Sequence, residues 1–348
     1  MVTYRSSNFG KLCYYSKSII SGTNYDAYAR NLIVKPTGNL KIQSNNSLTV
    51  TEWVDVNTNG DFDIRSGASL IQIDNVANSG NIRVYRDSQP MYKFDYTYWS
   101  TPITLNTASG YTLDDLSPDT QSDKYFTWLP TQSGANGNWI YENATTTEMA
   151  PTVGYAVRAP QTFSSNPLIK SIYTAVFNGT PNNGNYSAAI SVGTDANVGT
   201  YIGSTIVTAD DDQWNLIGNP YPSAIDILSF LNETNNSTML DGTAYVWTHN
   251  TPPSTSIPDP FYANYSSNYT SNDYASINSL GGTSTSSLGQ APSQYFASGQ
   301  GFFVLGLNNG SATFNNSMRV RNNNNNFFRT DNVNNSNNTF TTFEKHRI

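Results

Sequence analysis

Oxygen-bearing side chains alternate along one short segment, DVNTNGDFD, and they could coordinate a metal ion. The alternating residues are Asp55, Asn57, Asn59, Asp61 and Asp63. Carboxylate and amide oxygens at this spacing are typical of calcium loops, so Ca²⁺ is the one cofactor that the sequence suggests. An EF-hand would carry a glutamate at its twelfth position, where this chain has Ser66. The same residues also fit a structural repeat, which explains the pattern without metal.

A second candidate site is the tyrosine-rich segment between residues 250 and 289. Its rings alternate with short polar side chains, and the residues that we predict to bind a ligand are Tyr262, Tyr265, Tyr269, Tyr274, Asn264 and Asn268. Tyrosine gives a large contact area at low entropic cost, and asparagine adds adaptable hydrogen bonds. Such a surface suits sugar rings or a partner protein. The alternative is that the tyrosines only fasten a long loop to the domain.

Catalytic patterns receive little support from the sequence. The chain has two histidines, His249 and His346, and no serine lies in a Gly-x-Ser-x-Gly motif. A glycoside hydrolase needs only two carboxylates at a suitable separation, and acidic residues are available, but no pair stands out. We therefore expect a protein that is not an enzyme, with glycoside hydrolysis as the weaker alternative.

The composition restricts the partners. Only 12% of the residues are charged and the net charge is −7, so no basic patch is available to bind nucleic acid. No apolar run reaches the roughly 18 residues of a spanning helix, and we expect no membrane insertion. Aromatic residues make up 13% of a chain that is also rich in Thr and Asn, which favours strands joined by polar turns.

A short repeat indicates how the first part of the chain is organised. Three similar segments, GNLKI, GDFDI and GNIRV, begin at Gly38, Gly60 and Gly80, which are 22 and 20 residues apart. A period near 20 with short alternating strands predicts a β-solenoid-like region over residues 31–90. A β-meander of hairpins is the alternative. We expect residues 1–30 to be a leader or an irregular segment.

Longer and more aromatic strands follow, and they predict an antiparallel β-sandwich or jelly roll over residues 91–330. A division of this region into two subdomains is predicted near residue 205. Residues 331–348 are predicted to form a tail with a strand. One short helix is expected at residues 223–231, because Ser223 can cap it and Asp226 can complete a capping box. The segment WNLIGNPYPSAIDILSF (214–230), which includes this helix start, predicts a structural corner; a binding loop built on its Asn-Pro-Tyr-Pro turn is the alternative. The predicted fold class is therefore all-β, with a solenoid-like start, a sandwich and one short helix.

Eight short sequence motifs, in the order that they have in a known family, mark a resemblance that covers the chain from about residue 31 to its end. They are DYTYWSTPI (95–103), GYAVRAP (154–160), FNGTPNNG (177–184), WNLIGNPYPSAID (214–226), YVWTHN (245–250), SGQGFFV (298–304), MRVR (318–321) and EKHRI (344–348). Together they resemble a family of secreted surface proteins from Bacteroidetes of the kind exported by the type IX secretion system. Members usually carry a signal peptide before this region and a sorting domain after it. Neither is visible here, so the chain resembles a piece of such a protein or a variant lacking both.

The resemblance implies an extracellular or cell-surface location. We therefore expect a structural or adhesion protein that is displayed on the surface or self-assembles into a filament or matrix. Its partner would be further copies of itself or a surface glycan. The alternative is a carbohydrate-binding module of a larger secreted protein.

Overall fold

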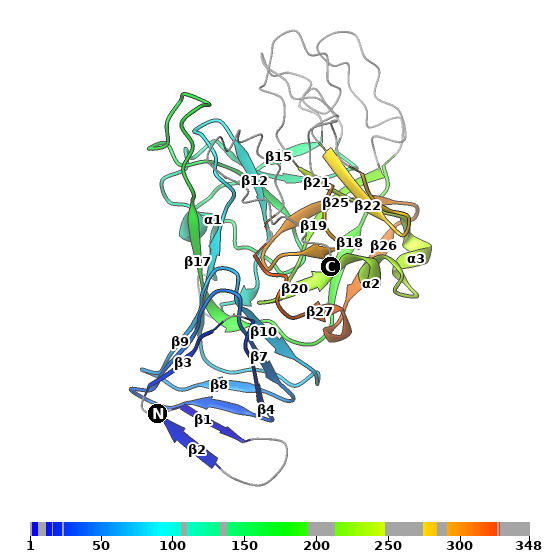
Figure 1. Ribbon diagram of the computed structural model, residues 1–348. Helices are drawn as coiled ribbons and strands as arrows, with labels where there is room; N and C mark the ends of the chain where they lie inside the picture. Colours follow the sequence, from blue (N-terminus) through cyan, green and yellow to red (C-terminus); the bar gives the residue numbers. More distant parts are fainter. Residues whose placement is uncertain are drawn as a thin grey trace, which may run out of the picture.

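The protein is built almost wholly of β-strands. The computed structural model describes residues 2–5, 12–15, 17–22, 24–105, 110–132, 138–193, 213–247, 274–283, 291–325 and 327. Strands dominate this part of the chain, which confirms the predicted all-β class. No helix within it is long and apolar enough to cross a membrane. Figure 1 shows the N-terminal strands in blue at one end of the molecule and the later sheets beyond them.

The N-terminal strands stack in parallel, and we call residues 17–87 the parallel stack. One sheet contains β3 (Lys17–Ile20), β6 (Asn39–Ile42), β9 (Asp61–Ile64) and β11 (Ile82–Asp87). A second contains β4 (Asp26–Ala29), β7 (Ser47–Val50) and β10 (Ser69–Gln72), and in a third β5 (Leu32–Val34) pairs with β8 (Val54–Val56). Leu40 lies beside Phe62, and Leu48 beside Leu70. The strand pairing therefore has the same spacing of 22 and 20 residues as the repeated segments, and the β-solenoid itself stays a prediction.

The repeat is set by buried apolar rows and by turn residues. Equivalent apolar residues of successive units are almost fully buried, so each unit covers the next. Asn45 and Gly67 occupy the same turn one repeat apart, and both have positive φ angles. Gly80 is required for a second reason. Its φ is +73°, and a Cβ there would lie 1.8 Å from the carbonyl oxygen of Val56.

The residues before the boundary predicted at residue 31 include regular strands, and two of these belong to the parallel stack. β3 and β4 are the first strands of the stack, paired with β6 and β7. Before them, β1 (Val2–Arg5) and β2 (Leu12–Tyr15) form an antiparallel hairpin that pairs with β5. The sequence did not reveal this repeat because the position 22 residues before Gly38 is a serine, Ser16, and not a glycine.

Strand pairing continues across the boundary predicted at residue 90. β11 pairs in parallel with β9 on one side and antiparallel with β17 (Thr174–Pro181) on the other, and β17 also pairs with β13 (Ile103–Thr104). One hydrophobic core contains Ile64, Val84, Trp99 and Phe177. The stack and the following region therefore share a sheet and a core.

Two antiparallel sheets face each other in the sandwich-like arrangement that was predicted. One contains β12 (Tyr96–Trp99), β16 (Tyr155–Arg158), β14 (Tyr125–Trp128) and β15 (Trp139–Tyr141). The other contains β19 (Trp214–Gly218), β25 (Gly301–Gly306), β21 (Leu240–Trp247), β22 (Tyr274–Asn278) and β23 (Gly281–Thr283). Aromatic side chains from both sheets pack together between them.

The last strands enclose a second core. They are β18 (Tyr186–Ile190) with β26 (Gly310–Phe314), and β24 (Tyr295–Phe296), β20 (Ala224–Asp226) and β27 (Arg319–Val320). Phe230, Phe302 and Phe314 are fully buried in this core, which begins with Ala188. Most residues of the first core precede β18, although Ala297 and Phe327 also belong to it, and the second core is built from β18 onward. The division expected near residue 205 lies outside the described residues, as does the tail strand expected over residues 331–348.

The described chain has three short helices where one was expected. They are α1 (Leu113–Leu116), α2 (Ile227–Leu231) and α3 (Asn236–Met239). α2 begins later than predicted, because residues 224–226 form β20 and Asp226 is the N-cap, accepting hydrogen bonds from the amides of Leu228 and Ser229. α1 is held by a capping box between Thr112 and Asp115. Helices of one turn are too short to leave a 3.6-residue pattern in the sequence.

A buried arginine joins the stack to the second core. The guanidinium of Arg319 donates hydrogen bonds to the carbonyl of Leu70 at 2.7 Å and to Ser223 Oγ at 3.3 Å. It also donates to Asn183 Oδ1 and Asn316 Oδ1, both at 3.1 Å, and lies 4.8 Å from the centre of the Tyr221 ring. Burial lowers the pKa of Arg319 to about 10, which still leaves it charged near neutral pH.

The phrases that carry the family resemblance meet around this arginine, in what we call the buried junction. Tyr221 of WNLIGNPYPSAID donates its hydroxyl proton to the carbonyl of Gly184 in FNGTPNNG at 2.6 Å. Asn182 of the same phrase donates to the carbonyls of Pro220 and of Thr101, which belongs to DYTYWSTPI. The corner predicted at residues 214–230 is thus a structural element, and four of the eight phrases of the resemblance meet at this junction.

Replacing Arg319 should be strongly destabilising. Arg319→Lys retains the charge but loses the fork of donors that binds four acceptors, so we expect the free energy of unfolding to fall by about 3–5 kcal/mol. Urea denaturation of the purified chain measures this change. Arg321→Lys, two residues away and 43% exposed at its side chain, is the matched control and should cost less than about 1 kcal/mol. Equal losses in the two variants would contradict the role assigned to the buried junction.

Candidate functional site

The contact between the two antiparallel sheets is lined by aromatic rings, and we call it the aromatic seam. Its buried members are Tyr98, Trp128, Trp139, Leu216, Trp247 and Phe303 with Ala156, and partly buried rings surround them. The Trp128 and Trp139 ring centres are 5.0 Å apart at 86°, and Trp128 meets Phe303 at 5.3 Å and 90°. Edge-to-face contacts of this kind align the positive edge of one ring with the negative face of the next.

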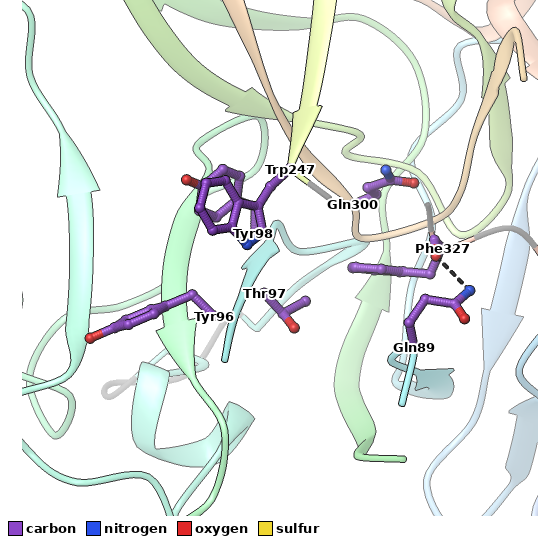
Figure 2. A pocket seen from close by; sticks show the side chains of 8 residues that line it. Gln89, Tyr96, Thr97, Tyr98, Trp247, Gln300 and Phe327 are labelled. Atoms are coloured by element: carbon purple, nitrogen blue, oxygen red, sulfur yellow. Dashed lines mark hydrogen bonds between the residues drawn. The ribbon is translucent and has the colours of Figure 1, made fainter. Parts of the chain in front are cut away.

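A small pocket opens at the margin of the aromatic seam. It is lined by Gln89, Tyr96, Thr97, Tyr98, Trp247, Gln300, Gly301 and Phe327. Figure 2 shows Tyr98 and Trp247 on one side and Phe327 with Gln89 on the other; Gln89 Nε2 donates to the carbonyl of Phe327 at 2.7 Å. The cavity measures about 20 Å³, which is room for one ordered water. A sugar ring is much larger than a water molecule, so this pocket could contact only its edge.

One tyrosine of the predicted binding loop falls in the described structure, and it belongs to the aromatic seam. The hydroxyl oxygens of Tyr274 and Tyr98 are 2.7 Å apart, and the Tyr274 ring lies 5.1 Å from Trp247 and 5.7 Å from Phe303. Tyr274 therefore packs β22 against the facing sheet. The other predicted ligand-binding residues lie outside the described residues: Tyr262, Tyr265, Tyr269, Asn264 and Asn268. Ligand binding by that loop stays a prediction.

The predicted calcium ligands are divided between two sheets of the parallel stack. Asp55 is in β8, where its carboxylate accepts hydrogen bonds from Ser79 Oγ at 2.6 Å and from Asn57 Nδ2 at 2.9 Å. Asn59 occupies the turn, with φ +65°. Asp61 and Asp63 lie beyond that turn, in β9. The strand order thus places these oxygens on different sheets.

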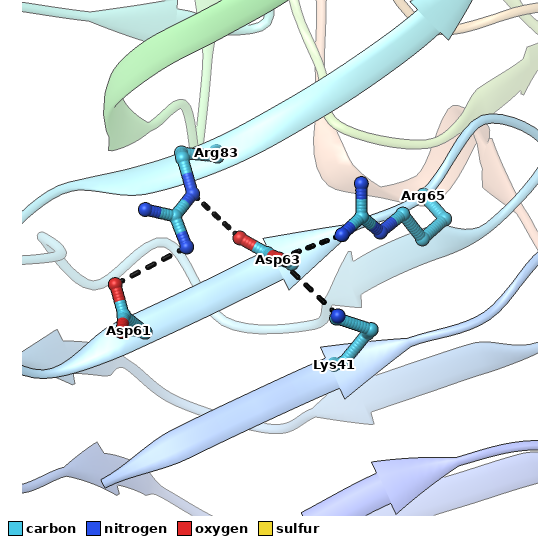
Figure 3. A network of polar contacts seen from close by, with 5 residues as sticks. All are labelled: Lys41, Asp61, Asp63, Arg65 and Arg83. Atoms are coloured by element: carbon cyan, nitrogen blue, oxygen red, sulfur yellow. Dashed lines mark hydrogen bonds and ion pairs between the residues drawn. The ribbon is translucent and has the colours of Figure 1, made fainter. Parts of the chain in front are cut away.

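Basic side chains surround the two carboxylates of β9 (Figure 3). Asp63 contacts Arg83 Nε at 2.6 Å, Arg65 Nη2 at 3.1 Å and Lys41 Nζ at 3.8 Å, while Asp61 contacts Arg83 Nη2 at 3.1 Å. The hydrogen bond to Asp63 raises the pKa of Arg83. Within the described residues, no group of three or more His, Cys, Asp or Glu side chains is arranged to hold a metal ion. Calcium binding stays a prediction, and here it would compete with these ion pairs.

The ion network follows from the repeat and could have been found in the sequence. Strand pairing aligns Lys41 with Asp63 and Asp63 with Arg83, so the three side chains form one row across β6, β9 and β11. They occupy the same place in the segments GNLKI, GDFDI and GNIRV, namely the fourth position. Charges of alternating sign at one repeat position predict such a row, because neighbouring strands place equivalent residues side by side.

The comparisons with known proteins place the chain in a family. A family model described as a domain of unknown function (DUF8693) matches residues 13–348. The chain belongs to this family. The match spans both the parallel stack and the antiparallel sheets, in line with the sheet and core that they share. No curated protein and no solved structure matched the chain.

Asp63 should matter more for stability than Asp61. Asp63→Asn would leave three basic groups around a neutral amide, and we expect the free energy of unfolding to fall by about 1–3 kcal/mol. Asp61→Asn is the matched control, because its carboxylate is half exposed and contacts one arginine; it should cost less than about 1 kcal/mol. Urea denaturation compares the two. A larger loss for Asp61→Asn would show that the network is misassigned.

Calorimetric titration with CaCl₂ tests the metal hypothesis on the same proteins. If this segment binds Ca²⁺, the wild-type chain gives a saturable heat of binding that both substitutions weaken. A titration without saturable heat would remove Ca²⁺ as a ligand of these residues.

Proposed function

We propose that the protein is a non-enzymatic structural or adhesion protein of the cell surface, and that its copies associate through the N-terminal end of the parallel stack. The observation that carries this proposal is the open edge of two sheets. Within the described residues, no strand pairs with the outer side of β3 or of β4. An unpaired edge presents a row of backbone donors and acceptors, which is a template for strand addition by another chain.

The opposite end of the stack supports the proposal by contrast. There β17 covers the edge of β11. The Leu70 amide of β10 donates to the carbonyl of Pro222 at 2.9 Å, and the Leu70 carbonyl accepts from Arg319. Within the described residues, the stack is thus covered where it meets the rest of the protein, and at its N-terminal end β1 covers β5 while the outer edges of β3 and β4 have no paired strand. Stacked repeats that work as monomers usually have polar caps at both ends.

The acidic groups of the described chain support a structural role. Asp226 caps α2, and Asp115 completes the capping box of α1. Glu142 accepts hydrogen bonds from Thr127 at 2.6 Å and Thr147 at 2.9 Å, and Glu233 accepts one from the Asn235 amide at 2.9 Å. Each of these carboxylates is engaged in holding a local turn or strand. Export and surface location rest on the sequence resemblance.

The proposal predicts that the purified chain associates in a concentration-dependent way. Sedimentation velocity over a range of concentrations should show the mean sedimentation coefficient rising reversibly. Protease treatment of intact cells should remove the protein from their surface, and cells lacking it should adhere or assemble matrix less well. A chain that stays monomeric at high concentration, together with unaltered adhesion of the deletion strain, would refute the proposal.

Carbohydrate binding is the alternative proposal, and it rests on the tyrosine-rich loop. A glycan array probed with the wild-type chain tests it directly. A hit that disappears when Tyr265 and Tyr269 are replaced by alanine would favour the alternative. An array without hits would count against it, because stacking on exposed rings should give at least weak binding.

A further inference from the structure

The outer edge of β4 has a regular pattern of backbone groups. The amide of Ser47 donates to the carbonyl of Tyr25 at 3.0 Å, and the amide of Thr51 donates to that of Ala29 at 2.9 Å. In a parallel ladder, alternate residues of a strand bond to the same neighbour. Residues 25, 27 and 29 therefore face β7, and Asp26 and Tyr28 direct their backbone groups outward. Within the described residues, no backbone hydrogen bond to Asp26 or Tyr28 comes from that side.

The side chains of this edge are divided by the same alternation. Ala27 and Ala29 point into the core, whereas Asp26 and Tyr28 lie on the outer face. Tyr28 is half exposed, and the guanidinium of Arg321 lies 4.9 Å from the centre of its ring. Arg30 follows the strand directly. Its side chain is 60% exposed and forms a 2.7 Å ion pair with Glu52.

This edge is complementary to itself when a second copy runs antiparallel. With the two-fold axis at Tyr28, each Tyr28 faces the other, and their outward amide and carbonyl groups can exchange two hydrogen bonds. The same register sets Asp26 of each copy opposite Arg30 of the other. Shifting the pairing by two residues places Asp26 opposite Tyr28, and shifting it by four places Asp26 opposite Asp26. Charge therefore favours the first register.

We propose that the β4 edge binds the β4 edge of a second copy in this antiparallel register, with Tyr28 at the two-fold axis. The inference rests on the proposed function, because it specifies where its self-association occurs. A pair of four-residue strands buries much less than the roughly 1,200 Å² of a standard interface, so the isolated dimer is weak. Many copies on one surface would compensate through multivalency.

A proline at position 28 tests the backbone pairing. Tyr28→Pro removes an outward amide and none of the hydrogen bonds to β7, so the stack should keep its fold. We expect the dimer dissociation constant to rise about tenfold or more. Tyr28→Ala is the matched control: it removes the ring, keeps the amide and should change the constant by less than about threefold. Sedimentation velocity measures both, and circular dichroism checks that each variant is folded.

A charge exchange tests the register. Arg30→Asp places like charges opposite each other at both ends of the interface and should weaken the dimer about tenfold. Adding Asp26→Arg restores opposite charges between the copies, but it also removes the 3.7 Å ion pair of Asp26 with Arg321 within the chain. The double variant should therefore bind more tightly than Arg30→Asp alone, which is the result that supports the register. Glu52→Gln removes the partner of Arg30 within the chain and should leave association unchanged. Weakening by Glu52→Gln equal to that by Arg30→Asp would overturn the inference, since the charge would then act inside the chain.

The outcomes separate this inference from the proposed function. A wild-type chain that stays monomeric at every concentration overturns both. Association that is the same in the wild type, Tyr28→Pro and Arg30→Asp overturns this interface and leaves the proposed function to another edge, such as that of β3. Strong hydrogen-exchange protection of the Tyr28 amide in dilute monomer overturns the inference too, because a segment of the same chain would then occupy the edge.

Discussion

The structure depends on the burial of one cation, the guanidinium of Arg319, among oxygen acceptors from distant parts of the chain. It bonds to the carbonyl of Leu70, which is 249 residues away, and to Ser223, which is 96 residues away. A buried charge is tolerated only when its donors are satisfied, and these acceptors are in place only when both halves of the protein are folded. The parallel stack and the second core are therefore coupled through this residue.

Buried amide side chains join other segments of the molecule. Asn182 and Asn219 are fully buried, and their side-chain amides donate to carbonyls of irregular segments, as Asn219 does to Ser223 and Ala297. Amides of this kind satisfy backbone groups where irregular segments cross. Within the described residues, the outer edges of β3 and β4 are unpaired at the N-terminal end of the stack, whereas β17 covers the edge of β11 at its other end. That difference between the two ends of the stack is the physical basis for proposing that copies associate there.

Much of the fold could be predicted from local patterns, and the errors have physical causes. The spacing of Gly38, Gly60 and Gly80 gave the period of the strand pairing, because equivalent residues of a stack repeat their environment. β3 and β4 were missed because their turns lack the marking glycine. Asp226 was assigned to the third position of a capping box, whereas it caps the helix itself. The pairing of β20 with β24 and β27 holds residues 224–226 in a strand, so the helix begins after Asp226.

For the candidate sites, too, the residue types could be predicted from the sequence, whereas their contacts depended on the fold. The segment from Asp55 to Asp63 has the composition of a calcium loop. Because the chain turns at Asn59, Asp55 lies in one sheet and Asp61 and Asp63 lie in another. Three basic residues surround Asp63. Tyr274 was predicted to belong to a binding surface, and in the structure its ring contacts Tyr98 of the facing sheet and Trp247 of the neighbouring strand in its own sheet. The sequence by itself determined the all-β class, the repeat and the turn positions, because these depend on residues close together in the chain. Only the tertiary structure decided which polar groups meet, which rings are buried and which edge stays open, because these depend on contacts between residues far apart in sequence.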